Sequence, residues 1–131
     1  MSAERVPDDR QYTKTHEWVQ LDGPRATVGI TDHAQALLTD IVFVDLPAAG
    51  KSVSAGASVL VLESVKTVAD VYAPGPGTVR EANAELKTHP ELVNQDPYGR
   101  GWLVRIELAG PVPPGTLLDA AAYRALVESG A

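Results

Sequence analysis

The sequence predicts one mostly β domain, built from short strands that pack as a sandwich or a barrel, with a short inserted helix and a second helix near the C-terminus. Eleven glycines and ten prolines among 131 residues supply many turns, which favours short strands over long helices. Short apolar or alternating runs lie between these turns, as expected of strands that bury at least one face. A hydrophobic fraction of 44% with 21% charged residues is typical of a globular protein.

The length of the chain limits its domain count. A chain of 131 residues is long enough for one domain with a sizeable core, and too short for two. We expect residues 1–11 to be a flexible N-terminal leader and residues 12–131 to form a single domain that includes the C-terminal helix. The leader is polar and lacks the apolar segment of a signal peptide, so we expect a cytoplasmic location. No apolar run approaches the roughly 20 residues that span a bilayer, so no membrane contact is predicted.

The first half of the chain contains four predicted elements. They are a strand at 12–19, a second strand at 25–30, a helix at 31–38 and a third strand at 41–46. A turn at 22–24 makes the first two strands a hairpin. Thr31 is a good N-cap for the helix. The strand at 41–46 is apolar on both faces except for Asp45, which predicts a buried strand.

The second half begins with a hairpin around Lys66 and continues with a strand at 77–82. The segment 83–100 is irregular, with one helical turn expected at 84–87. Residues 102–108 alternate, which predicts a strand with Trp102, Val104, Ile106 and Leu108 on one face and Leu103 and Arg105 on the other. One of these faces is expected to be buried and the other exposed to solvent. Asp119 caps a final helix through residue 127, whose docking face is Tyr123, Leu126 and Val127.

Charge and composition exclude several classes of function. The net charge of −6 and the absence of a basic cluster argue against nucleic-acid binding. The chain has no cysteine and only three widely spaced histidines, so we predict neither a thiol nucleophile nor a metal site. Nucleotide-binding glycine motifs and the nucleophile elbow of a serine hydrolase are also absent.

Lys66 is the most informative single residue. It is a lone positive charge between two apolar runs, at 59–62 and 68–72, and burying it unpaired would be costly. We therefore expect it at the exposed tip of a hairpin. The nearest charges along the chain, Glu63 and Asp70, are negative and favour the ammonium form, which weakens the alternative of an enzyme that uses Lys66 as a nucleophile. An exposed lysine on a rigid tip suits acylation by another protein.

Five motifs along the chain carry a family resemblance. They are YTKTHEWV at 12–19, GITDHAQ at 29–35, IVFVDLP at 41–47, ESVK at 63–66 and PELVNQDPYG at 90–99. In this combination the sequence resembles the H protein of the glycine cleavage system, from about residue 12 to the C-terminal helix. The resemblance implies a β sandwich of the lipoyl/biotinyl-carrier (hammerhead) type.

The resemblance also implies a carrier without a reaction of its own. (R)-lipoate would be joined to the Lys66 amine by a lipoate-attaching enzyme. The arm would take the aminomethyl group of glycine from the pyridoxal-phosphate glycine decarboxylase (P protein) and pass it to the aminomethyltransferase (T protein). Dihydrolipoyl dehydrogenase (L protein) would then reoxidise the dithiol. The cofactor carries the chemistry, and the protein presents and protects it.

Several residues near the lysine receive roles under this resemblance. The loaded arm is expected to fold back toward Thr15, Glu17 and Asp70, where the two carboxylates would stabilise the aminomethyl cation and Thr15 would supply a hydrogen bond. The alternative is that both acids are solvated. Glu63, three residues before Lys66, is expected to identify this lysine to the lipoate-attaching enzyme, and otherwise it is a surface acid that aids solubility.

Other carrier functions remain open at this point. A lipoyl domain of a 2-oxoacid dehydrogenase usually has Asp-Lys-Ala at its tip, whereas this chain has Val65-Lys66-Thr67. A biotin carrier is expected to have methionine on both sides of the lysine, which this chain lacks. The sequence does not separate a glycine-cleavage carrier from a protein that donates lipoyl groups to the 2-oxoacid dehydrogenase complexes.

Overall fold

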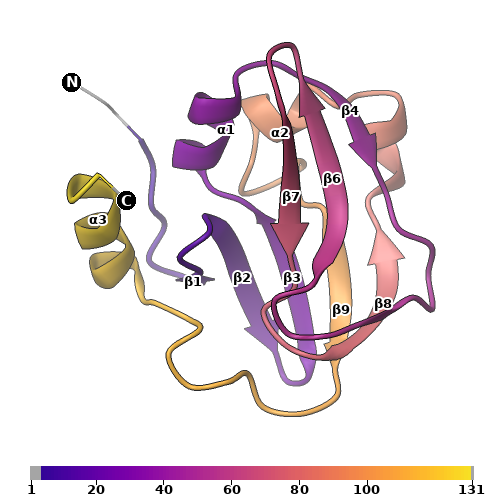
Figure 1. Ribbon diagram of the computed structural model, residues 1–131, viewed down its shortest axis with the longest axis vertical. Helices are drawn as coiled ribbons and strands as arrows, with labels where there is room; N and C mark the ends of the chain where they lie inside the picture. Colours follow the sequence, from indigo (N-terminus) through magenta and orange to yellow (C-terminus); the bar gives the residue numbers. More distant parts are fainter. Residues whose placement is uncertain (1–3, 131) are drawn as a thin grey trace.

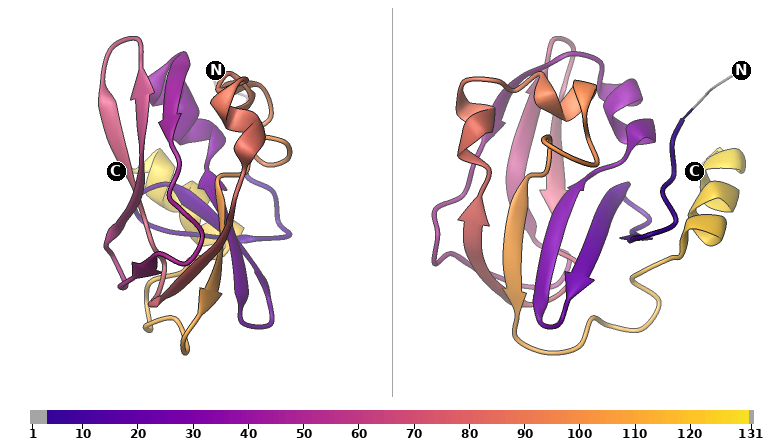
Figure 2. Two further views of the ribbon diagram at one scale, coloured as in Figure 1. Left: turned by 90° about the vertical axis from the view of Figure 1, so that its right-hand side faces the viewer. Right: turned by 180° about the vertical axis from the view of Figure 1, so that it is seen from behind.

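Two antiparallel sheets face each other in the computed structural model, which describes residues 4–130 (Figures 1 and 2). The larger sheet has the strand order β1 (Gln11–Tyr12), β2 (Glu17–Asp22), β3 (Arg25–Ile30), β9 (Val104–Leu108), β8 (Gly77–Ala82) and β5 (Ser52–Val53). The smaller sheet has the order β4 (Ile41–Asp45), β6 (Ser58–Ser64) and β7 (Val68–Tyr72). The turn of the β6–β7 hairpin lies at the top of the molecule in Figure 1.

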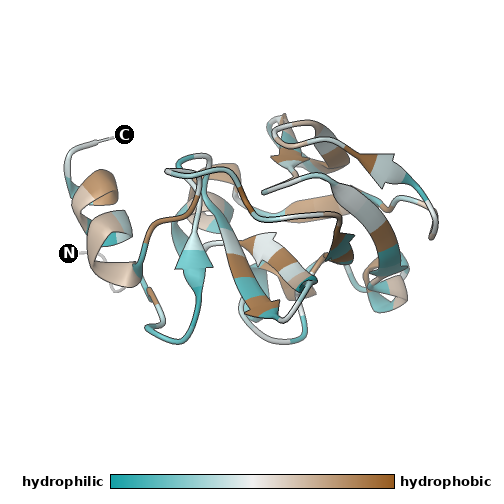
Figure 3. Cartoon of the chain, turned by 90° about the horizontal axis from the view of Figure 1, so that it is seen from below, coloured by the Kyte–Doolittle hydropathy of each residue, from teal (hydrophilic) through white to brown (hydrophobic). Residues whose placement is uncertain are grey.

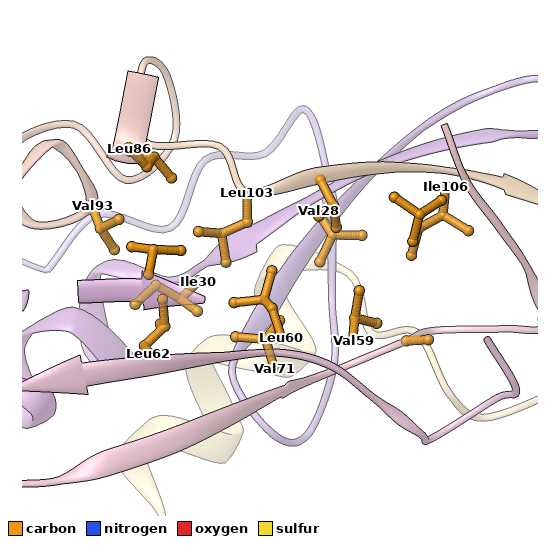
Figure 4. Close-up of a cluster of buried hydrophobic side chains, with 14 of the residues drawn as sticks. Val28, Ile30, Val59, Leu60, Leu62, Val71, Leu86, Val93, Leu103 and Ile106 are labelled. Carbon is orange, nitrogen blue, oxygen red and sulfur yellow. The ribbon is translucent and has the colours of Figure 1, made fainter. Parts of the chain in front are cut away.

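The main core lies between the two sheets. Figure 4 shows Leu60, Leu62 and Val71 of the smaller sheet pointing toward residues of the larger sheet, among them Val28 and Ile106. These five side chains are almost completely excluded from solvent. Burying each side chain of this size stabilises the fold by about 1.5–3 kcal/mol. Leu60, Leu62 and Val71 therefore mark the face of the hairpin that looks inward.

Four helical segments decorate the sheets: α1 (Asp32–Leu38), the 3₁₀ helix η1 (Ala84–Lys87), α2 (Leu92–Gln95) and α3 (Ala120–Glu128). The predicted caps are present, because Thr31 accepts a hydrogen bond from the Ala34 N–H and Asp119 accepts one from the Ala122 N–H. None of the helices in the described residues is both long and apolar enough to cross a membrane.

Helix α3 packs at one end of the molecule, outside the main sandwich (Figure 3). It covers a second cluster made of aromatic and small residues: Tyr12, Trp18, Tyr98, Ala120 and Tyr123. The rings of Tyr12 and Tyr123 stack with centroids 4.7 Å apart. Leu126 and Val127 pack against the same cluster, so the predicted docking face of α3 is confirmed.

The described part of the leader makes more contacts than its sequence suggests. The guanidinium of Arg10 lies 4.7 Å from the centre of the Trp18 ring and donates to the Tyr98 carbonyl. The Tyr12 hydroxyl donates to the Pro7 carbonyl, and Arg124 of α3 donates to the Val6 carbonyl. Residues 4–10 thus lie against the aromatic cluster, while residues 1–3 of the predicted leader lie outside the described residues.

Three strand predictions are wrong in detail. The expected strand at 12–19 is interrupted by a turn, because His16 adopts a left-handed backbone conformation with φ of 71°. Strand β4 is an edge strand and not a fully buried one, so Val42 and Phe43 are 52% and 50% exposed. Leu103, assigned to the same face as Arg105, lies before the start of β9 and does not follow its alternation, and its side chain is completely buried in the main core.

Candidate functional site

Lys66 lies at the tip of the β6–β7 hairpin, as predicted, and its side chain is exposed. The turn is held by Ser64, whose hydroxyl oxygen accepts from the backbone N–H groups of Lys66 at 3.2 Å and Thr67 at 3.0 Å. The Ser64 N–H donates to the Thr67 carbonyl at 2.8 Å. A further bond, from the Val65 N–H to the Asp40 carbonyl at 3.0 Å, ties the tip to the segment before β4. The backbone that carries the lysine is therefore fixed on both sides.

The Lys66 ammonium group is free of ion pairs within the described chain. Neither Glu63 nor Asp70 forms a salt bridge with it, although they are its nearest charged neighbours in sequence. Asp70 instead accepts a hydrogen bond from the Ser58 hydroxyl at 2.7 Å. The amine is thus accessible to an enzyme that approaches the tip.

A cleft of about 170 Å³ runs along the free edge of β7. We call it the edge cleft; its lining residues are Thr15, His16, Glu17, Ile30, Ala34, Leu37, Leu38, Leu62, Ala69, Asp70 and Val71. The structure therefore brings Thr15, Glu17 and Asp70 to one cavity, although Asp70 is more than fifty residues away in the sequence. Most of the remaining wall is apolar and comes from α1 and β7. Such a wall suits an aliphatic chain that ends in a polar group.

The two carboxylates of the edge cleft have different environments. Glu17 is 1% exposed, whereas Asp70 is exposed. The Glu17 carboxylate accepts hydrogen bonds from the hydroxyl of Thr13, from the hydroxyl of Thr15 at 2.6 Å and from the backbone N–H of Tyr72 at 3.2 Å. Burial raises the pKa of Glu17, and these hydrogen bonds partly oppose the rise. The idea that both acids are simply solvated is therefore wrong for Glu17.

A larger cleft of about 620 Å³ lies on the other side of the same carboxylate. It shares Thr15 and Glu17 with the edge cleft and is otherwise lined by residues 13–14, 55–56, 72–74, 113 and 115–116. Glu17 therefore stands in the wall between two cavities. Its hydrogen-bond partners Thr13 and Tyr72 were not predicted from the sequence. The spacing of Thr13, four residues before Glu17, was a weak signal, and nothing in the sequence pointed to Tyr72.

An accessible amine on a rigid tip, with an apolar cleft beside the same hairpin, is the arrangement expected of a carrier protein that holds a group on a lysine. The sequence model of the family described as glycine cleavage H-protein matches residues 10–130. The chain therefore belongs to the glycine cleavage H-protein family.

Individual relatives agree with this assignment. A glycine cleavage system H protein of Symbiobacterium thermophilum is 49% identical over 95% of this chain and 98% of that protein. One from Thermus thermophilus is 50% identical over 96% of this chain and 98% of that protein. The crystal structure of a glycine cleavage system H protein from Mycobacterium marinum covers 96% of this chain and 100% of that chain, with a TM-score of 0.85 and 40% identity.

These comparisons confirm the resemblance and the fold class predicted from it, a lipoyl-type β sandwich with helical additions. They also confirm the general function, a lipoyl carrier of the glycine cleavage system. The division of the chain at residue 11 and the roles of individual residues stay predictions.

Proposed function

We propose that Lys66 carries (R)-lipoate in amide linkage and that the chain catalyses no reaction of its own. The observation that carries this proposal is the exposed, unpaired amine of Lys66 at a rigid hairpin tip. The residues present fit the group, because acylation needs an accessible amine and the fixed turn presents one. When bound, the lipoyl group supplies the two sulfurs that a chain without cysteine lacks.

The carrier role requires one partner that loads the arm and another that unloads it. Under this proposal the chain takes the aminomethyl group from the glycine decarboxylase and delivers it to the aminomethyltransferase. Dihydrolipoyl dehydrogenase restores the disulfide, and a lipoate-attaching enzyme installs the arm. The family assignment supports this set of partners.

The edge cleft is the proposed resting place of the arm. Lys66 and Asp70 are four residues apart on a nearly extended chain, which corresponds to about 13 Å. A lysine side chain lengthened by a medium-length acyl chain covers a comparable distance. Its end then lies in the cleft lined by Asp70, Glu17 and Thr15, with the apolar wall along its length.

The carboxylates give this resting place a preference for a cationic cargo. Asp70 offers an exposed negative charge at the mouth of the edge cleft, and Glu17 offers a buried one in its wall. A protonated aminomethyl amine can donate a charge-assisted hydrogen bond to either carboxylate. The apolar wall formed by α1 limits the access of water, which slows the loss of the cargo.

Glu63 is the proposed recognition residue for the lipoate-attaching enzyme. It pairs with Phe43 on one side and Val68 on the other, so the three residues form one row across β4, β6 and β7. Directly paired residues point to the same face of a sheet, and in this row that face is exposed. The strands of this sheet contain no lysine or arginine, which supports a partner with a basic contact group.

Intact mass spectrometry of the protein from the cells that natively make it tests the proposal. We expect a mass increase equal to one lipoyl group, and we expect the Lys66→Arg variant, which keeps the charge but cannot form the same amide, to lack it. A native protein of unmodified mass under conditions in which glycine is degraded would overturn the proposal. A lipoyl group found on another lysine would overturn the assignment of the site.

A further inference from the structure

The hydroxyl of Tyr123 lies between two residues that shape the edge cleft. It is 2.7 Å from Nδ1 of His16 and 2.7 Å from Oγ1 of Thr31. Tyr123 belongs to α3, which lines no part of the edge cleft itself, and its side chain is completely buried. The C-terminal helix is therefore connected to the cleft by one side-chain oxygen.

The first partner, His16, holds the turn that carries Thr15 and Glu17. Its left-handed backbone conformation is unfavourable for a residue other than glycine and persists only where surrounding contacts enforce it. The His16 N–H donates to the Thr13 carbonyl at 3.2 Å, and the His16 carbonyl accepts from the Thr31 N–H at 3.0 Å. The bond to Tyr123 is the hydrogen bond that fixes the ring of His16.

The second partner, Thr31, holds the opposite wall. Its hydroxyl oxygen caps α1 by accepting from the Ala34 N–H at 3.1 Å, and Ala34 lines the edge cleft together with Leu37 and Leu38 of the same helix. A single oxygen on α3 thus contacts the Glu17 side of the cleft and the α1 side.

We propose that Tyr123 is a positioning residue: its hydroxyl fixes the spacing between the Thr15–Glu17 turn and α1, and so sets the width of the cleft that receives the arm. This inference rests on the proposed resting place of the arm. It assigns to the C-terminal helix a role in protecting the cargo, in addition to its packing on the aromatic cluster. Tyr123 acts through His16 and Thr31 and does not itself line the edge cleft.

The stacked partner of Tyr123 provides a matched control. Tyr12 is equally buried, and its hydroxyl also makes a hydrogen bond, but to the Pro7 carbonyl of the N-terminal segment. Tyr12→Phe and Tyr123→Phe each remove one buried hydroxyl and keep the ring that stacks at 4.7 Å. Only Tyr123→Phe removes a contact to the walls of the edge cleft.

Hydrogen exchange of the chain without lipoate is the first test. The amide protons of Thr31 and Ala34 report on the two bonds beside the Tyr123 hydroxyl. We expect Tyr123→Phe to speed their exchange about fivefold, the effect of losing one net hydrogen bond, and Tyr12→Phe to leave them within a factor of two of wild type. Equal exchange at these amides in wild type and Tyr123→Phe, or equal acceleration in both variants, would overturn the inference.

Release of the aminomethyl group from lipoylated, loaded chains separates this inference from the proposed function. We expect release to be faster in Tyr123→Phe than in Tyr12→Phe, and fastest in Glu17→Ala. If wild type and Glu17→Ala release the group equally fast, the proposed resting place is wrong. If Glu17→Ala is fast but Tyr123→Phe matches Tyr12→Phe, the resting place stands and the positioning role of Tyr123 is wrong.

Discussion

The carboxylate of Glu17 accepts a hydrogen bond from the backbone N–H of Tyr72 at 3.2 Å, across the gap between the two sheets. Glu17 begins β2 of the larger sheet, and Tyr72 ends β7, an edge strand of the smaller one. An edge strand presents backbone N–H groups without a neighbouring strand to accept them. The Glu17 side chain satisfies one of these groups and at the same time lines the edge cleft.

The stability of the protein should depend on pH through Glu17. Burial raises the pKa of Glu17 above its usual value of 4.5, so the folded state binds a proton more readily than the unfolded state. Ionisation of Glu17 therefore costs stability as the pH rises from 4.5 through the raised pKa. We expect the free energy of unfolding of wild type, measured relative to Glu17→Gln, to be larger at pH 4.5 than at pH 7, so that wild type is relatively more stable at the lower pH. Urea denaturation at both values checks this, and a difference that does not change with pH would contradict it.

Asp70 should contribute to the retention of a cationic cargo, whereas Asp45 should not. Both are exposed and pair with Val61 in one row of the smaller sheet, but Asp45 lies on the opposite edge strand, β4. We expect Asp70→Asn to speed non-enzymatic release of the aminomethyl group by roughly three- to tenfold, as for the loss of one partly exposed charged contact. Release is followed by mass spectrometry of the loaded chain. Equal release rates in Asp70→Asn and Asp45→Asn would contradict a specific role of Asp70, because the rate would then depend only on the overall charge of this sheet.

Removal of the Glu63 carboxylate should slow installation of the arm. We expect Glu63→Gln to lower the kcat/KM of lipoylation at Lys66 by about tenfold, mainly through KM, because an interfacial charge contact of this kind contributes about 1–3 kcal/mol. Glu81→Gln is the control, since Glu81 is an exposed acid on β8 of the other sheet. Lipoylation of Glu63→Gln at the wild-type rate would assign Glu63 to solubility alone.

Gly29 should tolerate no side chain. A Cβ added there would lie 2.4 Å from Nε1 of Trp18, whose N–H donates to the Pro97 carbonyl at 2.8 Å. We expect Gly29→Ala to destabilise the fold by about 1–3 kcal/mol, the usual cost of overpacking, and to shift the tryptophan fluorescence. Gly110→Ala is the matched control because a Cβ there would meet nothing within 4 Å. Equal unfolding free energies of the two variants would contradict the close packing of Trp18.

Local patterns in the sequence were sufficient to predict the hairpin that carries Lys66. Two apolar runs on either side of a charged residue can bury their side chains only by pairing and leaving the lysine in water. The helix caps at Thr31 and Asp119 were also predictable from local sequence, because each side chain accepts a hydrogen bond from an amide only three residues away. The resemblance carried by the family motifs then predicted the arm and its cycle, and it predicted that Thr15, Glu17 and Asp70 share one site.

Other features depended on contacts that no short pattern encodes. Strand β4 has the composition of a buried strand, yet it lies at the edge of its sheet because only β6 pairs with it. The turn at His16 breaks an apparently continuous strand, because its unfavourable backbone conformation is stabilised by Thr31 and by Tyr123, which lies 107 residues away in the sequence.

By itself the sequence determined the carrier hairpin: a mostly β chain that exposes Lys66 at a hairpin tip and has no cysteine. Only the tertiary structure decided that Glu17 is buried, that its partners include Tyr72, and that the C-terminal helix contacts both walls of the edge cleft. The physical reason is the range of the interactions. Strand pairing in a hairpin and helix capping act between residues a few positions apart, whereas burial of a carboxylate depends on which distant segments pack around it.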